Sequence, residues 1–154
     1  MNALRQVARR SLWAVVGVAA ILAAGCAGVG KAPVKLTGGQ EVPPMGGNSS
    51  GTADITIFAT KCASSATSNS CPQAFGTVTT SGFVATAAHI HRGKAGQNGS
   101  VIIPLNKTGE NSWAVPDRTF LSESDYGAYQ DGELYVNVHS ANNPNGEVRG
   151  QLVP

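Results

Sequence analysis

Short segments in which apolar and polar residues alternate run from residue 52 to the C-terminus. In Glu133–His139 the side chains of Leu134, Val136 and Val138 share one face, and polar side chains occupy the other. Turn residues, chiefly Gly, Asn and Pro, separate such segments at short intervals. We therefore predict strands over Thr52–Phe58, Thr77–Thr80, Phe83–His91, Val101–Ile103, Ser112–Val115, Glu133–His139 and Glu147–Val153. This pattern predicts an all-β fold, an antiparallel Greek-key β-sandwich or barrel.

One segment departs from this alternation and predicts a short helix near residues 122–130. Ser122 is a suitable N-cap, and Glu123 and Asp125 place negative charge at the positive end of the helix dipole. Gly132 is expected to end the helical region.

The first 25 residues predict a targeting segment. Three arginines precede an uncharged run, Leu12–Ala24, which is too short for a comfortable membrane span. The run ends in Leu-Ala-Ala-Gly-Cys, which resembles the lipobox of bacterial lipoproteins and implies lipidation of Cys26. An ordinary secretory signal is the alternative. Many bacterial lipoproteins are retained in the inner membrane by an aspartate after the cysteine. Since Ala27 holds that place here, the resemblance implies the outer membrane, facing the periplasm or the cell surface.

Cleavage before Cys26 would leave 129 residues, enough for one core: a tether over 26–33 and a domain over 34–154. The arginines Arg5, Arg9 and Arg10 would be lost, which leaves eight basic and nine acidic residues. A chain with this charge has no basic patch that would favour a nucleic-acid partner.

Cys62 and Cys71 form an even pair in a chain expected to be exported. They predict a disulfide that closes a short polar loop. A reactive or metal-binding pair is the alternative, although the spacing is too wide for a redox CxxC motif.

The three histidines are the strongest candidates for a functional site. His89 and His91 flank Ile90 on one predicted strand, so their imidazoles share a face, and His139 ends another strand on its polar face. They form a metal site only if these strands are neighbours, and solvated surface positions or hydrogen bonds to turns are the alternatives. Three imidazoles suit copper or zinc and leave one coordination position open.

Several charged residues near these motifs are weaker candidates. Glu41 could be a catalytic carboxylate, but a structural partnership with Arg149 or Lys35 is favoured. Glu147 and Arg149 share a strand face, which favours a surface ion pair. Arg92 and Lys94, beside the histidine pair, would favour small anions if they are not simply solvated turn residues.

Three spaced motifs together resemble the CHRD domain, first named from chordin. They are Leu36-Thr-Gly-Gly-Gln-Glu-Val-Pro-Pro44, Ala88-His-Ile-His-Arg-Gly93, and Leu134-Tyr-Val-Asn-Val-His139 with Pro144-Asn-Gly-Glu-Val-Arg-Gly-Gln-Leu152. The resemblance covers nearly all of the expected mature chain. It implies a β-sandwich and no single settled activity.

A more distant resemblance is to the copper-ligand strands of Cu,Zn superoxide dismutases. It implies copper ligation by His89, His91 and His139, and it matches Arg149 to that family's substrate-guiding arginine. The chain lacks a further histidine to complete that ligand set or bridge to zinc. Dismutation is therefore less expected than metal binding.

The leading hypothesis is a lipid-anchored cell-envelope module that binds copper, or less readily zinc. A role in binding or delivering the metal is favoured over an enzymatic one, and modest redox chemistry at the open coordination position stays an alternative. An adhesion or interaction module without metal is the alternative, and a reduced superoxide dismutase-like redox enzyme is a third.

Overall fold

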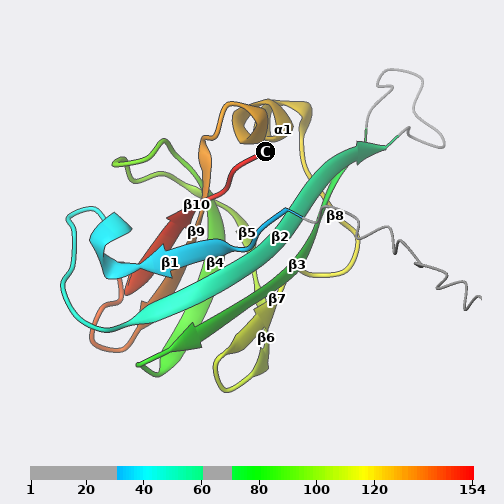
Figure 1. Ribbon diagram of the computed structural model, residues 1–154. Coiled ribbons are helices and arrows are strands. Elements are labelled where there is room, and N and C mark those ends of the chain that lie inside the picture. Colours follow the sequence, from blue (N-terminus) through cyan, green and yellow to red (C-terminus); the bar gives the residue numbers. More distant parts are fainter. Residues whose placement is uncertain (1–30, 61–70) are drawn as a thin grey trace, which may run out of the picture. The chain divides into compact units, whose positions relative to one another are not determined.

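Strands make up most of the computed structural model, which describes residues 31–60 and 71–154, all within one compact unit, Lys31–Pro154. The described part contains ten strands, one short 3-10 turn and one α-helix (Figure 1). Their bounds are β1 Val34–Thr37, η1 Gly38–Gln40, β2 Ser50–Thr60, β3 Cys71–Ser81, β4 Ala85–Arg92, β5 Val101–Pro104, β6 Asn106–Gly109, β7 Ser112–Ala114, β8 Thr119–Phe120, α1 Glu123–Gln130, β9 Leu134–Ser140 and β10 Val148–Gln151.

All strand pairs are antiparallel, and the sheet order is β5-β4-β9-β10-β1-β2-β3-β7-β6, with β8 beside β3. The two ends of this order meet because β5 and β6 are almost continuous in sequence. Within the stretch 101–109, β5 pairs with β4, and Leu105 N–H donates to Ala88 O at 3.0 Å. The chain then continues into β6, which pairs with β7. The sheet thus curls into a nearly closed barrel with crossovers between non-consecutive strands, which confirms the all-β antiparallel prediction.

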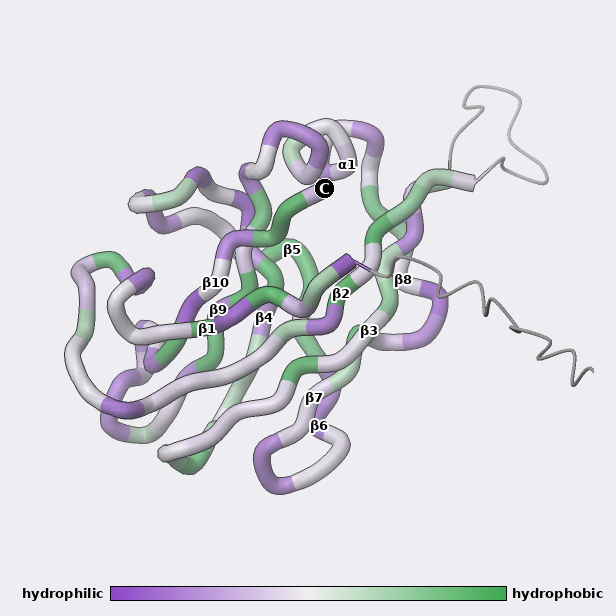
Figure 2. The backbone as a smooth tube through the Cα atoms, viewed as in Figure 1, coloured by the Kyte–Doolittle hydropathy of each residue, from purple (hydrophilic) through white to green (hydrophobic). Residues whose placement is uncertain are grey.

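The barrel interior is filled by the apolar face of each alternating strand. Leu134, Val136 and Val138 of β9 are fully buried in the core, as the alternation predicts. Ile90 of β4 and Trp113 of β7 join them. Figure 2 shows hydrophilic residues mainly in the connections, for example between β6 and β7. Because Ile90 and Val138 point into the core, the adjacent histidines of β4 and β9 belong to the outer face.

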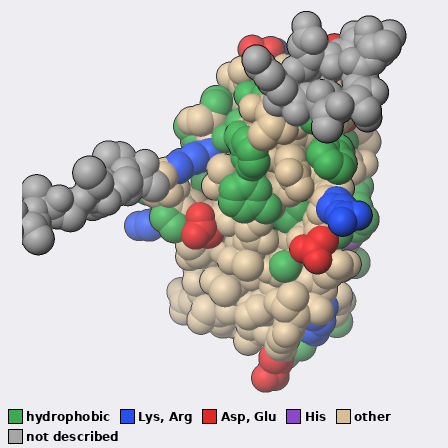
Figure 3. Space-filling view, turned by 90° about the vertical axis from the view of Figure 1, so that its right-hand side faces the viewer, with side chains coloured by type: hydrophobic (Ala, Val, Ile, Leu, Met, Phe, Trp, Pro, Cys, Tyr) green, Lys and Arg blue, Asp and Glu red, His purple; other side chains and the backbone are tan. Residues whose placement is uncertain are grey.

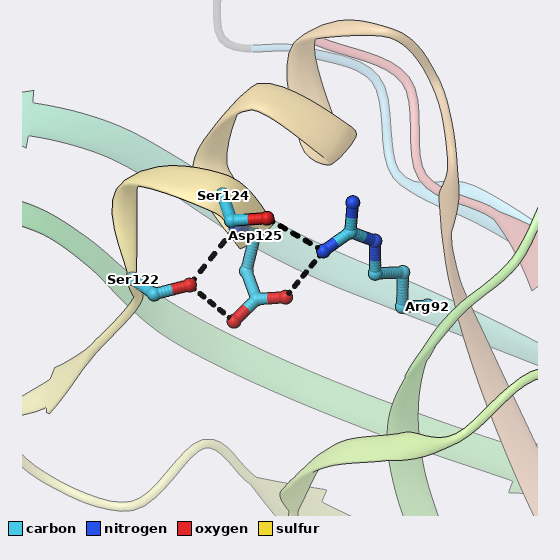
Figure 4. A network of polar contacts seen from close by, with 4 residues as sticks. All are labelled: Arg92, Ser122, Ser124 and Asp125. Atoms are coloured by element: carbon cyan, nitrogen blue, oxygen red, sulfur yellow. Dashed lines mark hydrogen bonds and ion pairs between the residues drawn. The ribbon is translucent and has the colours of Figure 1, made fainter.

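The helix α1 forms where it is predicted. Ser122 accepts a hydrogen bond from the Asp125 backbone N–H at 3.0 Å, as an N-cap should. Figure 4 shows Arg92, the last residue of β4, donating to Ser124 Oγ at 2.8 Å and pairing with Asp125 at 3.4 Å. The start of the helix is thus attached to the strand that carries His89 and His91.

Several sequence predictions fall outside the described residues. The targeting segment, the lipidation site Cys26 and one partner of the expected disulfide, Cys62, all lie there. The bond between Cys62 and Cys71 therefore stays a prediction. Within the described ranges, no helix is both long and apolar enough to cross a membrane.

Candidate metal centre

The histidines project from the outer face of two paired strands of the sheet. β4 and β9 are antiparallel neighbours, with His89 opposite Asn137 and Ala87 opposite His139. All three imidazoles lie on the face opposite the core, as the alternation predicts. The strands are neighbours, which is the condition that the sequence left open.

The three rings come within ligand distance of one another. One nitrogen from each of His89, His91 and His139 can be chosen so that all three lie within 4.8 Å of each other. His89 Nδ1 and His139 Nε2 are 2.9 Å apart, and the ring centroids of His89 and His91 are 5.6 Å apart. The described part of the chain brings no other histidine, cysteine or carboxylate into this cluster.

Backbone carbonyls determine which nitrogens are free to bind a ligand. His91 Nδ1 lies 3.0 Å from Gly99 O, and His139 Nδ1 lies 3.0 Å from Pro144 O. A carbonyl can only accept, so each Nδ1 carries the proton and each Nε2 keeps its lone pair. The remaining contact then requires His89 Nδ1 to donate to His139 Nε2. A metal ion could replace that bond with ligation by His91 Nε2, His139 Nε2 and His89 Nδ1, provided that the proton of His89 moves from Nδ1 to Nε2.

The electrostatic environment keeps all three imidazoles neutral. Burial lowers the pKa of His89, of His91 and of His139 below 6.5. Neighbouring histidines lower the pKa of His91 and His139 further, whereas the two carbonyl contacts partly oppose these effects. At neutral pH, lone pairs are therefore available without prior loss of a proton.

His91 is the most enclosed of the three, although it sits on the outer face. Its side chain is 9% exposed, and Nε2 is buried without a hydrogen-bond partner. The His91 ring stacks on Tyr135, with 4.9 Å between centroids. A buried polar atom without a partner is costly, so this nitrogen is a candidate ligand atom.

The cover over His91 is the segment 93–100, which Arg149 holds in place. Arg149 is 1% exposed and donates to Gln97 O and Lys94 O, each at 2.9 Å. Its guanidinium also lies 3.4 Å from the Tyr135 ring centroid. These contacts fit the structural alternative for Arg149, because both terminal guanidinium nitrogens are already used by the protein.

Gly99 allows this cover to lie against β4. A Cβ at this position would be 1.6 Å from Arg92 O, so no other residue fits without moving the backbone. The close approach brings Gly99 O to His91. A glycine at the end of such a turn was the only sequence signal for this contact.

A second buried group, Glu41, is bonded to Asn137, the residue opposite His89, and was not assigned to the site from sequence. Glu41 is 5% exposed and accepts hydrogen bonds from Asn137 Nδ2 at 2.9 and 3.2 Å. Desolvation raises its pKa to about 7, although Arg149 and the Asn137 hydrogen bond act in the opposite direction. Gly146 passes directly above, where a Cβ would lie 2.6 Å from both Glu41 Oε2 and Asn137 Nδ2.

The expectation of an ion pair between Glu147 and Arg149 is wrong. Glu147 does not pair with Arg149 but accepts hydrogen bonds from Ser49, Ser140 and Asn143. These bonds keep the pKa of Glu147 low, although desolvation by burial opposes them. Glu147 lies just before β10, and Ser49, Ser140 and Asn143 are nearer partners for it than Arg149.

Arg92 and Lys94 do not form an uncompensated positive patch for anions. Arg92 pairs with Asp125 at 3.4 Å, and Lys94 pairs with Glu133 at 3.3 Å. Both carboxylates come from later segments of the chain, which is why local sequence did not reveal them.

Comparison with known families agrees with this architecture. Residues 32–152 match the family model of the CHRD domain, which covers most of the chain. Searches of curated proteins and of solved structures each gave no significant match.

Proposed function

This chain belongs to the CHRD domain family, and we propose that it binds one transition-metal ion through His89, His91 and His139. The carrying observation is the convergence of three neutral imidazoles, each with a nitrogen within 4.8 Å of the others. Imidazole nitrogen is among the commonest metal ligands in proteins.

Three features of the site support metal binding over a structural cluster. The lone pair of His91 Nε2 is buried and has no partner. Two carbonyls orient His91 and His139 with Nε2 facing the cluster, as ligating histidines usually require. The hydrogen bond between His89 and His139 uses one ring nitrogen of each and leaves His91 Nε2 outside it.

The donor set favours copper, with zinc as the alternative. All three donors are imidazoles, and divalent copper binds nitrogen ligands more tightly than zinc does. Three protein ligands leave a coordination position open to water or a small molecule. The resident ion would therefore be exchangeable or reactive rather than purely structural.

Metal stoichiometry on the tag-free chain starting at residue 26 tests the proposal. We expect one Cu(II) per chain at micromolar metal, and loss of at least tenfold in affinity in His91→Ala. Asp117→Ala, which removes an exposed carboxylate, is the matched control and should leave binding unchanged. Substoichiometric copper, or unchanged affinity when all three histidines are alanine, would sink the proposal.

We also propose that the protein is exported and held at an envelope membrane by lipid on Cys26, most consistently the outer membrane. The support is the basic start, the uncharged run and the lipobox-like Leu-Ala-Ala-Gly-Cys. Mass spectrometry of the purified protein should find a lipidated N-terminus at residue 26. Cys26→Ser should release the protein from membranes, and membrane retention of that variant would contradict the proposal.

A further inference from the structure

Three phenylalanines lie exposed on one face of the barrel. Phe58 of β2, Phe75 of β3 and Phe120 of β8 are 37%, 48% and 60% exposed. The chain has four phenylalanines, and only Phe83 packs against the core. Aromatic side chains normally supply core burial, so three exposed ones on one face indicate an interaction surface.

The strand register makes these side chains one patch, here called the phenylalanine face. Phe58 is opposite Gln73, and Gln73 is opposite Phe120, so all three point to the same side of the sheet. Phe75 follows two residues after Gln73, and its ring centroid is 5.4 Å from that of Phe58. Figure 3 shows hydrophobic side chains gathered on this side of the barrel.

The N-terminal segment reaches the barrel at this same end. Val34 is paired with Ala53 in antiparallel register. Before Val34 the chain is no longer paired with β2, and Lys31 donates to Tyr129 Oη of α1 at 2.9 Å. Seven residue steps separate Cys26 from Pro33, a span of at most about 25 Å. A lipid on Cys26 would therefore keep the bilayer close to the phenylalanine face.

The same arrangement would keep the histidines away from the bilayer. Around the barrel, β4 and β9 are separated from β2 and β3 by β10 and β1 on one side and by β5, β6 and β7 on the other. The outer faces of these two strand pairs therefore point in opposite directions. With the phenylalanine face on a membrane, the metal centre would open toward water.

We propose that Phe58, Phe75 and Phe120 rest on the lipid bilayer that holds the anchor and fix the barrel with its histidine site facing the aqueous phase. This rests on the lipidation proposed for Cys26, not on metal binding. Contact is shallow, because Asp54 lies exposed on the same face four residues before Phe58. The bilayer is favoured over a protein partner because the tether length supplies the proximity.

Site-specific fluorescence in lipid vesicles tests this orientation. Phe75→Trp is made in the full lipidated protein and reconstituted into vesicles of phosphatidylethanolamine and phosphatidylglycerol with brominated acyl chains. Val84→Trp is the control: Val84 is 69% exposed, in the turn beyond the other end of β3. It lies roughly 20 Å from residue 75 along the strand direction, because β3 continues for six residues beyond Phe75 before the turn. The native Trp113 is buried and gives a constant background.

We expect bromine to quench the tryptophan at 75 at least twofold more than the one at 84, and Phe120→Trp to behave like Phe75→Trp. Equal quenching of all three would overturn the proposal, as would absence of lipid on Cys26 by mass spectrometry. Dimerisation of the unlipidated Cys26→Ser protein through this face, abolished by Phe75→Ser, would assign the face to a second copy instead. Copper titration of the same samples measures metal binding independently, so a failure of the orientation proposal can be told apart from a failure of the histidine proposal.

Discussion

Among single residues, Glu41 is the one whose protonation should most affect folding. Its pKa rises from 4.5 to about 7 because burial disfavours the charged carboxylate. At a pH between these two pKa values, Glu41 is protonated in the folded chain and ionised in the unfolded chain. The contribution of Glu41 to the free energy of unfolding therefore falls as pH rises from about 4.5 to 7.

Glu41→Gln should remove this dependence, because the amide stays neutral and can still accept from Asn137. We expect the variant to match the natural protein at pH 4.5 and to be more stable at pH 8, by up to roughly 3 kcal/mol. Urea denaturation at both pH values measures this. The exposed Glu110→Gln is the control, and an equal gain at both pH values would contradict the explanation.

At the scale of elements, the segment 93–100 depends on one side chain from β10. Arg149→Ala would leave the Lys94 and Gln97 carbonyls without their guanidinium donor and remove the cation from the Tyr135 ring. We expect a loss of about 3 kcal/mol in the free energy of unfolding. Copper affinity should fall by about tenfold, because Gly99 O would no longer be held against His91.

Lys35→Ala removes an exposed cation from β1 and is the matched control for Arg149→Ala. Chemical denaturation gives the stability, and isothermal titration with Cu(II) gives the affinity. Copper affinity unchanged in a folded Arg149→Ala protein would show that the segment does not position His91.

The N-cap of α1 gives a smaller, local prediction. Ser122→Ala removes the acceptor for the Asp125 N–H and should cost about 1 kcal/mol, measured by thermal unfolding. Ser124→Ala, which removes only the acceptor for Arg92, should cost less. An equal loss in the two variants would argue against capping as the cause.

The elements also show what sequence could reveal. Alternation placed Leu134, Val136 and Val138 inward and His139 outward, because each strand has one buried face. It did not reveal that Tyr135 and Asn137 on the outer face are buried too. That burial comes from loops distant in sequence, including the one that carries Glu41. The neighbourhood of β4 and β9, and hence the histidine cluster, likewise depends on long-range pairing.

For the whole molecule, metal binding and folding should be linked through pH. The pKa values of the three histidines are below 6.5 in the folded chain, so as pH falls through 6.5 the unfolded chain takes up protons first. The histidine contribution to stability is thus present above pH 6.5 and lost below it.

Copper should raise Tm by on the order of 5–10 °C at pH 7.5 when its free concentration is 100 times Kd. The increment should shrink below pH 6.5, because protons then compete for the same nitrogens. Calorimetry at pH 7.5 and pH 5 measures both. An increment independent of pH would exclude imidazole ligation, and the protein with all three histidines replaced by alanine should show none.

The near-continuity of β5 and β6 has a consequence for behaviour at high concentration. Because one stretch of chain pairs with β4 through β5 and with β7 through β6, both β4 and β7 have a partner where an open sheet would leave an unpaired edge. Open sheet edges are where foreign strands add and fibrils begin. We therefore expect the folded barrel to resist the addition of a foreign strand between β4 and β7 even when the protein is concentrated.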